Sequence, residues 1–284
     1  MKGRSVPFSR STWYCIGVSS VFHSLSVFCT FVATRHIYPV GIDFSRIADR
    51  YDESRGGSER GQRFAAELAP HLPPGLLLEV GVGTGVVAAA MRQPVIGVDI
   101  AAGMLKSARQ RLGARVVRSD GRGLPFRDGC FSGGYAVWVL HLVEDQAGLF
   151  SEVRRVLAPG GTFVIVNINR PAPDDLDAIL KPMYVELLGD RDGRDLPERL
   201  APLAEAAGLQ VKDVLAGEPF RREVSGPEEA DRIERREGAI FWDLDQDRWR
   251  ELVEPVLGRL RAFGDRPVAR EHHHQLLVLE RRSR

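Results

Sequence analysis

The chain has 284 residues, of which 44% are hydrophobic and 27% are charged, and its formal net charge at pH 7 is +1. A chain of this kind can bury a full core, as one large domain or as one domain with an appended piece, and it is neither a disordered chain nor a generally basic nucleic-acid binder. Its three cysteines, Cys15, Cys29 and Cys130, cannot form a closed disulfide framework. It contains no C-x-x-C or H-E-x-x-H motif, so the sequence predicts no metal site.

The first forty residues differ in composition from the rest. They hold four basic and no acidic residues, whereas the remaining 244 residues hold 35 basic and 38 acidic ones. Residues 11–34 carry no charged side chain and are long enough to cross a bilayer, although they include His23 and many Ser and Thr. Three interpretations of residues 1–40 stay open: a start codon assigned too far upstream, a membrane anchor or cleaved targeting segment, and an ordinary N-terminal helix.

Beyond residue 40, short apolar runs alternate with helical stretches, a pattern typical of a parallel α/β sheet. A helix is expected at 59–72, where prolines 73 and 74 and Gly75 end it. Seven strands are expected at 76–80, 95–99, 115–119, 131–139, 162–168, 211–220 and 275–280. Further helices are expected at 86–91, 102–112, 145–157, 176–188, 196–207 and 248–263. The charged run at 223–236 is expected to be a solvated face.

The segment LLLEVGVGTG at 76–85 carries the strongest functional pattern. Glycine permits positive φ and lets a ligand approach the backbone closely, and Gly81, Gly83 and Gly85 follow a predicted strand. Their spacing is G-x-G-x-G, whereas the dinucleotide fingerprint requires G-x-G-x-x-G, and position 86 is Val. Glu79 lies two residues before the first glycine, where a carboxylate would repel a pyrophosphate and suit a cationic ligand.

Two aspartates follow the next predicted strands. Asp99 ends the second strand and can accept hydrogen bonds from both ribose hydroxyls, and Asp120 follows the third and can accept one from an adenine amino group. Each acid alone is equally well explained as a helix cap or a loop residue. Because open α/β sheets bind ligands at the carboxyl ends of their strands, the acids and the glycines together indicate one ligand site.

Five segments in order resemble the successive motifs of class I S-adenosylmethionine-dependent methyltransferases: LLLEVGVGTG, VIGVDIAAGMLKSAR, VVRSDGRGLPF, YAVWVLHLV and FSEVRRVLAPGGTFVIVN. The resemblance covers about residues 44–170 and is closest to the small-molecule branch that includes the ubiquinone and menaquinone C-methyltransferases. FSRIADRYDES also resembles the usual opening of such domains. One departure is Ser132, where the fourth strand often has Asp after its opening Phe; another is the short helix after Gly85.

The resemblance implies an α/β fold: a three-layer, doubly wound, Rossmann-like sheet of about seven strands, mostly parallel with one antiparallel strand. It implies a domain at 41–284, in which residues 171–250 cover the substrate. It also implies S-adenosyl-L-methionine as the cofactor, a small-molecule acceptor and a cytoplasmic location, with no nucleic-acid partner. Membrane contact is expected only if residues 11–34 are an anchor. In the cover, Tyr184, Phe220, Phe241, Trp242 and Trp249 could wall an apolar pocket or simply pack in a core.

The resemblance also assigns roles to single residues. The methionine part of the cofactor would be lined by Glu79, Gly81, Gly83 and Gly85, and Trp138 would lie beside it and beside the substrate. Asp99 would bind the ribose. The adenine ring would pack against Ile100 and Met104, its amino group would be bound by Asp120 and Gly121, and Tyr51 would cover the cofactor. Met104 could equally be a core residue.

His141 is the best candidate for a catalytic base, with a purely structural histidine as the alternative. Glu144 and Asp145 are expected to cap the next helix. Asn169 and Arg170 would contact a substrate or cap the sheet edge.

The function predicted is methyl transfer to a small molecule by in-line displacement. The alternative from another class is a non-catalytic or regulatory protein that binds S-adenosylmethionine. A nicotinamide dehydrogenase is disfavoured by the missing third glycine of its fingerprint. Nucleic-acid methylation is disfavoured because the chain has no basic stripe and no N/D-P-P-Y motif.

Overall fold

The computed structural model describes residues 44–46, 48–168, 170–189 and 193–283, so the expectations for residues 1–40 lie outside the described residues. Its main sheet contains β1 (Leu77–Val80), β2 (Val95–Asp99), β3 (Val116–Arg118), β4 (Phe131–Val137), β5 (Leu157–Val166), β7 (Leu209–Ala216) and β10 (Gln275–Arg281). The strand order is β3-β2-β1-β4-β5-β10-β7. Strands β1 to β5 pair in parallel and β10 runs antiparallel to β5 and β7, which confirms the predicted fold class.

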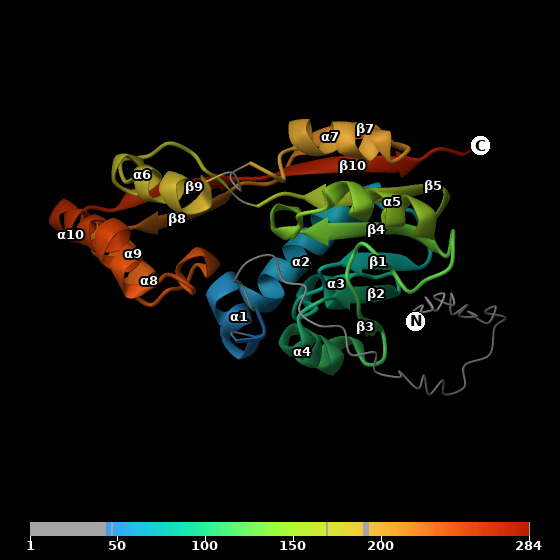
Figure 1. Cartoon of the computed structure of the whole chain (residues 1–284), viewed down its shortest axis with the longest axis horizontal. Coiled ribbons are helices and arrows are strands. Elements are labelled where there is room, and N and C mark those ends of the chain that lie inside the picture. Colours follow the sequence, from blue (N-terminus) through green and yellow to red (C-terminus); the bar gives the residue numbers. More distant parts are fainter. Residues whose placement is uncertain (1–43, 47, 169, 190–192, 284) are drawn as a thin grey trace, which may run out of the picture.

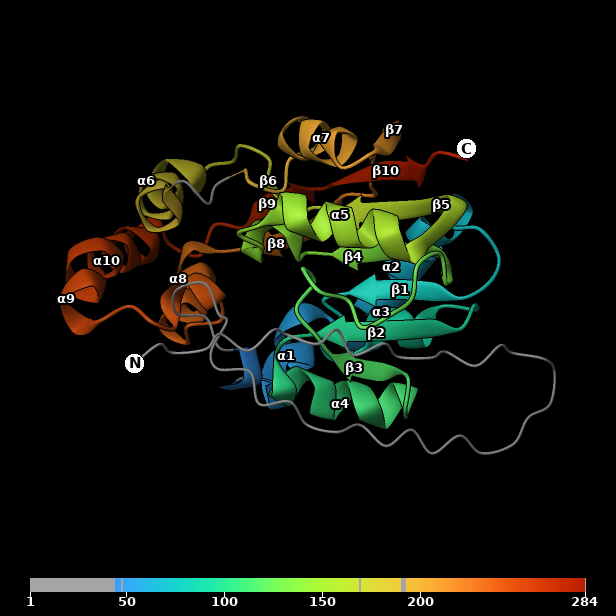
Figure 2. The same cartoon turned by 45° about the vertical axis from the view of Figure 1, so that its right-hand side comes forward.

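Helices cover both faces of this sheet (Figure 2). α2 (Gly57–Leu68), α3 (Val86–Ala90) and α4 (Ala102–Leu112) pack on one face, and α5 (Gln146–Val156) and α7 (Pro197–Ala206) pack on the other. A hydrophobic core lies on each face of the sheet. The strands contribute side chains to both cores because neighbouring side chains point to opposite faces, as Leu276 and Leu277 of β10 do. The main sheet is therefore the middle layer of three.

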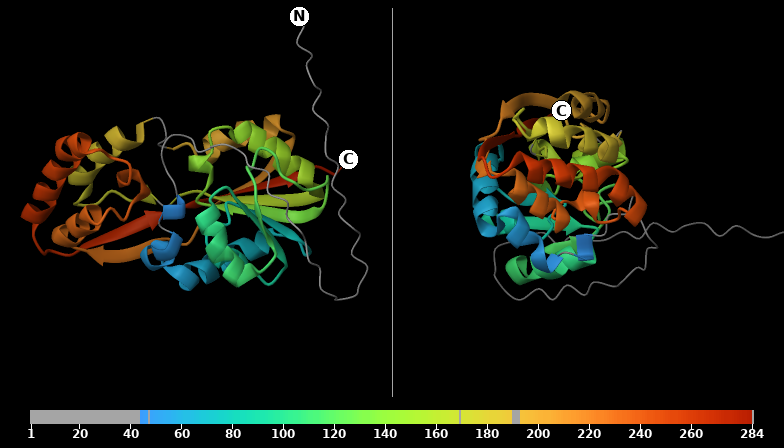
Figure 3. Two further views of the ribbon diagram at one scale, coloured as in Figure 1. Left: turned by 60° about the horizontal axis from the view of Figure 1, so that its bottom comes forward. Right: turned by 90° about the vertical axis from the view of Figure 1, so that its left-hand side faces the viewer.

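A second part of the molecule, here called the lobe, lies beyond the carboxyl ends of the parallel strands (Figures 1 and 3). It contains α6 (Asp177–Leu188), α8 (Gly226–Glu234), α9 (Gln246–Arg248), a π-helical turn (Trp249–Val253) and α10 (Glu254–Phe263). A small antiparallel sheet completes it, in the order β6 (Arg170–Pro171), β9 (Val268–His273) and β8 (Phe220–Val224). The helices share a core of their own with Val224 and Val268 of this sheet. Strand β9 leads directly into β10, so one stretch of chain joins the lobe to the main sheet.

Two expectations about the region after Pro171 are wrong. Residues 211–220 are not one strand, because the chain turns at Gly217, whose N–H donates to the His274 carbonyl, and passes from β7 into β8 of the other sheet. The charged run at 223–236 is not merely a solvated face. It forms α8, which begins with a capping box between Ser225 and Glu228 and buries Ala230 and Ile233. The two apolar residues at i and i+3 are hard to recognise among so many charges.

The segment 171–250 divides between the two parts of the molecule. α7 and β7 belong to the main sheet and its covering layer, whereas α6, β8, α8 and α9 belong to the lobe. The lobe also includes α10 and β9, which lie beyond residue 250, the predicted end of the cover. Within the described residues no helix is both long and apolar enough to span a bilayer.

Candidate functional site

The glycine loop joins β1 to α3 through Gly81, Gly83 and Gly85, whose φ angles are +72°, +53° and +82°. All three adopt the left-handed conformation that favours glycine. A Cβ atom on Gly81 would lie 2.3 Å from Cγ2 of Val139, and one on Gly85 would lie 3.3 Å from Cα of Ala108. A Cβ atom on Gly83 would meet nothing within 4 Å. Packing accounts for two of the glycines, and only Gly83 leaves open space at which a ligand could approach the backbone.

Asp99 holds this loop in place from the end of β2. One carboxylate oxygen accepts a hydrogen bond from the Gly83 N–H at 2.8 Å, and the other accepts one from the Ala101 N–H at 2.8 Å, at the start of α4. Burial raises the pKa of Asp99, and the backbone hydrogen bonds oppose that effect. Ile100 is half-buried beside it, and its carbonyl accepts a hydrogen bond from Arg118. Because each carboxylate oxygen can accept more than one hydrogen bond, Asp99 retains acceptor capacity for a ligand hydroxyl.

Glu79 is buried at the end of β1, with 2% of the residue exposed. The hydroxyl of Tyr135 on β4 donates to its carboxyl group at 3.1 Å. Burial raises the pKa of Glu79 to about 8, although the hydrogen bonds from Tyr135 and from the Ala88 N–H and the charge of Arg60 lower it. A buried carboxyl group that is protonated near neutral pH can ionise when a cationic ligand group arrives beside it.

Arg60 is the residue at this site that the sequence analysis missed. It lies on α2, only 8% exposed, with its guanidinium 5.3 Å from the ring centroids of both Tyr51 and Trp138. Its buried Nη1 atom has no hydrogen-bond partner among the described residues. The sequence held one signal: Arg60 lies one helical turn before Phe64, so a charge falls on the apolar stripe of the predicted helix.

Trp138, just after β4, is strained in a way that marks functional sites. Its φ angle is +56°, in the left-handed region that a bulky side chain rarely adopts. Its ring packs edge-on against Phe64 at 5.2 Å and lies 6.5 Å from Phe220 of the lobe. Its buried Nε1–H has no hydrogen-bond partner in the part of the chain that the structure describes. Arg60 and Trp138 therefore present two buried donors without acceptors, an arrangement that suits an anionic ligand group.

The N-terminal helix α1 (Ala48–Arg55) covers the start of α4. Met104 is 2% exposed and shares a small core with Ala48, Ala101, Phe44 and Tyr51. This packing is the core role that the sequence left open for Met104. Tyr51 lies against the Arg60 guanidinium, and its role in covering the cofactor stays a prediction.

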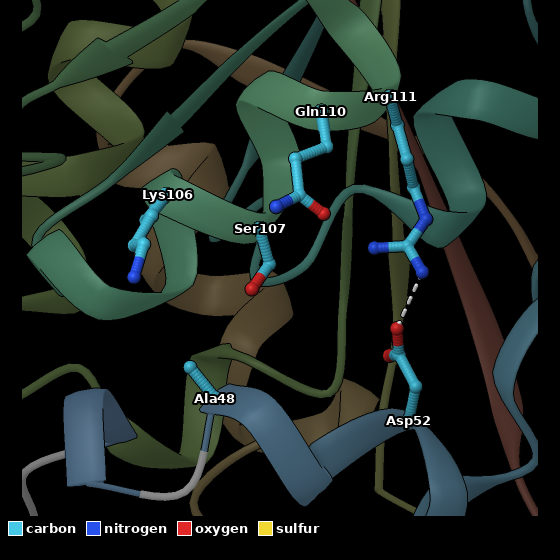
Figure 4. A pocket seen from close by; sticks show the side chains of 6 residues that line it. All are labelled: Ala48, Asp52, Lys106, Ser107, Gln110 and Arg111. Atoms are coloured by element: carbon cyan, nitrogen blue, oxygen red, sulfur yellow. Dashed lines mark hydrogen bonds and ion pairs between the residues drawn. The ribbon is translucent and has the colours of Figure 1, made fainter.

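Asp52 of α1 ties this helix to the glycine loop and to α4. It accepts hydrogen bonds from the Thr84 hydroxyl at 2.6 Å and from Arg111 at 2.7 Å. Figure 4 shows the ion pair between Asp52 and Arg111 at the wall of a cavity of about 210 Å³. A second cavity, of about 270 Å³, is lined by residues of α2 and α3 and also by Arg111. Neither is lined by a predicted site residue, so we do not take either as the ligand site.

Asp120 follows β3, as expected, but its carboxylate already has a partner. Arg122 donates from Nε to Oδ1 at 3.1 Å and from Nη2 to Oδ2 at 2.6 Å, and these hydrogen bonds hold the pKa of Asp120 below its usual range. Gly121 lies under α5, where a Cβ atom would come within 2.8 Å of Leu149. An adenine amino group would have to share Asp120 with Arg122.

His141 lies on a short 3-10 turn (Leu140–Leu142) just after β4, and Asp145 caps α5, as predicted, by accepting a hydrogen bond from the Gly148 N–H. The Nδ1 atom of His141 lies 3.7 Å from the carboxylate of Asp195, which also pairs with Arg170 at 2.7 Å. Arg170 therefore pairs with a buried acid, Asp195, which the sequence did not predict as a site residue. Asn169 lies outside the described residues. Most of the predicted aromatic wall packs inside the lobe, where Phe241 contacts both Tyr184 and Trp249.

Within the described residues no group of three or more His, Cys, Asp or Glu side chains could hold a metal ion. The site consists of an open glycine, the buried carboxyl group of Glu79, the half-buried carboxylate of Asp99, and the buried donors of Arg60 and Trp138, which have no hydrogen-bond partner among the described residues.

Comparison with known proteins identifies the family of the chain. The methyltransferase domain family matches residues 78–165. A demethylmenaquinone methyltransferase of Thermus thermophilus is 29% identical over 205 residues, which cover 64% of this chain and 93% of that protein. An uncharacterised protein of Methanocaldococcus jannaschii is 32% identical over 202 residues, which cover 69% of this chain and 92% of that protein. The chain belongs to the class I S-adenosylmethionine-dependent methyltransferases. The cofactor of this methyltransferase is S-adenosyl-L-methionine.

Solved structures agree with the fold of this methyltransferase. A phosphoethanolamine N-methyltransferase of Haemonchus contortus, in complex with phosphomonomethylethanolamine and S-adenosylhomocysteine, superposes with a TM-score of 0.51 at 19% identity, over 84% of this chain and 58% of that one. The [4+2]-cyclase SpnF superposes with a TM-score of 0.50 at 20% identity, over 88% of this chain and all of that one. At these identities the structural similarity concerns the fold alone.

Proposed function

We propose that this methyltransferase transfers a methyl group from S-adenosylmethionine to a small-molecule acceptor. The observation that carries the proposal is the combination of one open glycine with buried polar groups that lack partners. Gly83 leaves room beside the backbone, and Arg60 and Trp138 have donor atoms without acceptors. A ligand with a carboxylate would satisfy both donors.

The residues present fit the cofactor group by group. Arg60 and Trp138 would hold the methionine carboxylate, and Glu79 would face the ammonium group, whose charge would favour the ionised form of this buried acid. Asp99 would accept hydrogen bonds from the ribose hydroxyls, next to Gly83. When bound, the cofactor supplies an electrophilic methyl group and a good leaving group. The task of the protein is to position the acceptor in line with that methyl group and to exclude water.

The lobe supports the proposal of a small acceptor. It lies beyond the carboxyl ends of the parallel strands, and Phe220 on its strand β8 approaches Trp138 and Phe64 of the main domain. These three rings provide an apolar, aromatic boundary beside the cofactor residues. The cover proposed for residues 171–250 thus meets the site through β8. Several relatives are named demethylmenaquinone methyltransferases, so a reduced naphthoquinone is a sensible first acceptor to try.

The first experiment is calorimetric titration of the full-length protein with S-adenosylhomocysteine. Wild type is expected to bind, and Asp99→Ala is expected to bind more weakly. Asp247→Ala is the matched control, because this carboxylate is 93% exposed and lies on the lobe. Absence of binding by folded wild type would contradict the cofactor assignment.

The second experiment measures methyl transfer from labelled S-adenosylmethionine to a panel of reduced naphthoquinones, phenols and amines. Transfer to any of them supports the proposed function. Binding of S-adenosylhomocysteine without transfer to any acceptor favours the second candidate, a non-catalytic or regulatory S-adenosylmethionine-binding protein. The fold is compatible with both candidates, because one fold can carry different functions, as the superposition with the cyclase SpnF illustrates.

A further inference from the structure

One face of helix α2 carries both a residue of the candidate site and the residues that contact the base of the lobe. Arg60 lies against Trp138, with its guanidinium 5.3 Å from the ring centroid. Arg63, Phe64 and Glu67 follow Arg60 on α2 at i+3, i+4 and i+7, which places all four on the same side of the helix. The helix is therefore a direct physical link between the site and the lobe.

The carboxylate of Glu67 bridges two residues at the base of the lobe. Its Oε2 atom lies 2.7 Å from Nε2 of His274, between β9 and β10, and its Oε1 atom accepts a hydrogen bond from Nε of Arg63 at 3.3 Å. The side chain of His274 is 0% exposed and that of Glu67 is 14% exposed. Burial raises the pKa of Glu67, but the hydrogen bonds and charges of His274 and Arg63 together outweigh burial and hold the pKa below its ordinary value. A partly buried carboxylate with two such partners has a defined position.

Both partners of this carboxylate contact Phe220, the first residue of β8. The Arg63 guanidinium lies 3.4 Å from the centroid of the Phe220 ring, and its Nη2 atom donates to the carbonyl of Glu218. The ring centroids of His274 and Phe220 are 6.4 Å apart. The His274 ring also leaves no room for a Cβ atom on Gly217, at the turn from β7 into β8. The chain from this turn to Phe220 is therefore fixed against α2.

Phe220 in turn packs on Trp138, whose backbone is strained. The φ angle of Trp138 is +56°, and such a conformation persists only where the surroundings over-determine it. Its ring contacts Phe64 at 5.2 Å, Arg60 at 5.3 Å and Phe220 at 6.5 Å. The first two residues lie on α2, whereas Phe220 belongs to the lobe. Removal of the Phe220 ring should therefore let Trp138 relax and displace its buried Nε1–H.

We propose that Glu67 and His274 are positioning residues that act through Phe220 to hold Trp138 in the geometry that binds the cofactor. This rests on the proposed function, which places the methionine carboxylate on Trp138. The lobe accordingly contributes to cofactor affinity through the position of one aromatic ring. Because coupling between two sites is reciprocal, bound cofactor should in turn stabilise the contact between the lobe and α2.

The test is calorimetric titration of the full-length protein with S-adenosylhomocysteine. Phe220→Leu keeps an apolar side chain and removes the ring, and Glu67→Ala removes the bridge between Arg63 and His274. Each is expected to weaken binding at least about fivefold. The double variant should bind within about twofold of Phe220→Leu, because Glu67 acts through Phe220. Glu67→Gln, which keeps a hydrogen-bonding group of the same shape, should lose less affinity than Glu67→Ala. Glu59→Ala, an exposed residue of the same helix, is the matched control and should bind as wild type does.

The indole N–H signal of Trp138 in NMR spectra, assigned with Trp138→Phe, reports its position directly. It should shift in both Phe220→Leu and Glu67→Ala and stay in place in Glu59→Ala, and amide dispersion checks that each variant is folded. Shifted signals with non-additive losses of affinity support the proposal.

Three results would overturn it. Additive losses in the double variant would show that Glu67 does not act through Phe220. Weak binding by Trp138→Phe with wild-type binding by Phe220→Leu would overturn this inference and leave the proposed function standing. Wild-type binding by Trp138→Phe would overturn both this inference and the proposed placement of the methionine carboxylate.

Discussion

Glu79 should make the free protein less stable as the pH rises. Its pKa is raised to about 8 in the folded protein from the ordinary value of 4.5, so between these values the native state binds more protons than the unfolded state. Stability from this group is therefore greatest at low pH and is lost as the pH rises from about 4.5 to 8. At 1.36 kcal/mol for each pKa unit, the free energy of unfolding should fall by about 4 kcal/mol between pH 5 and pH 9.

Glu79→Gln tests this reasoning because glutamine has nearly the same shape and does not titrate. Its carbonyl oxygen can still accept from Tyr135 or from the Ala88 N–H. Urea unfolding of the free protein at pH 5, 7 and 9 should show the variant gaining about 4 kcal/mol relative to wild type across this range. The exposed Glu198→Gln is the matched control and should follow wild type at every pH.

The same variant should bind S-adenosylhomocysteine at least about tenfold more weakly, because a neutral amide cannot pair with the ammonium group. A protein that is more stable at high pH and weaker in binding would link the buried acid to the ligand. Two results would refute the reasoning: a pH dependence of stability that is equal in wild type and Glu79→Gln, or a variant that loses stability relative to wild type as the pH rises.

Four other substitutions separate binding from folding. Gly83→Val should block ligand binding and cost about 1–2 kcal/mol of stability, because valine disfavours the left-handed backbone at this position. Gly81→Val should lower the Tm further, because its Cβ would lie 2.3 Å from Val139. Calorimetric titration and thermal unfolding distinguish the two variants. Asp99→Ala should weaken S-adenosylhomocysteine binding by about 1.5–3 kcal/mol, roughly 10- to 150-fold, and binding equal to wild type would place the ribose elsewhere. Arg60→Met should weaken binding by a similar factor. The Tm of the free protein should fall only slightly, because the variant loses the guanidinium contacts with the Tyr51 and Trp138 rings but also removes Nη1, which has no hydrogen-bond partner among the described residues. A lower Tm with unchanged affinity would assign Arg60 to the fold alone.

The structure contains nearly every strand that the sequence predicted for the main sheet. The two wrong predictions, for residues 211–220 and 223–236, have the same cause. Buried parallel strands are short apolar runs between turn residues, so their pattern is local and survives in a single sequence. The split of 211–220 into β7 and β8 depends on a contact between Gly217 and His274, which lie far apart in the chain. The buried face of α8 depends on partners such as Arg222, which binds Glu229 at 2.9 Å.

The residues of the candidate site also divide into those that the sequence predicted and those that it did not. The glycines and Asp99 could be found because their roles follow from the ends of single strands, where φ and position are set locally. Arg60 and Asp195 could not, because nothing near them in the sequence says that they are buried. Asp195 lies 54 residues after His141, in a region without a clear pattern, and only the packing of that segment onto the strand ends brings the two together.

The sequence by itself determined the α/β fold, the glycine loop and the class of cofactor, since all three depend on residues that are close along the chain. Tertiary structure decided that Gly83 faces open space, that Arg60 and Trp138 have buried donors without hydrogen-bond partners among the described residues, and that Asp195 lies near His141. These properties depend on how distant segments pack against one another, and burial in that packing changes the charge state and the free partners of each polar group.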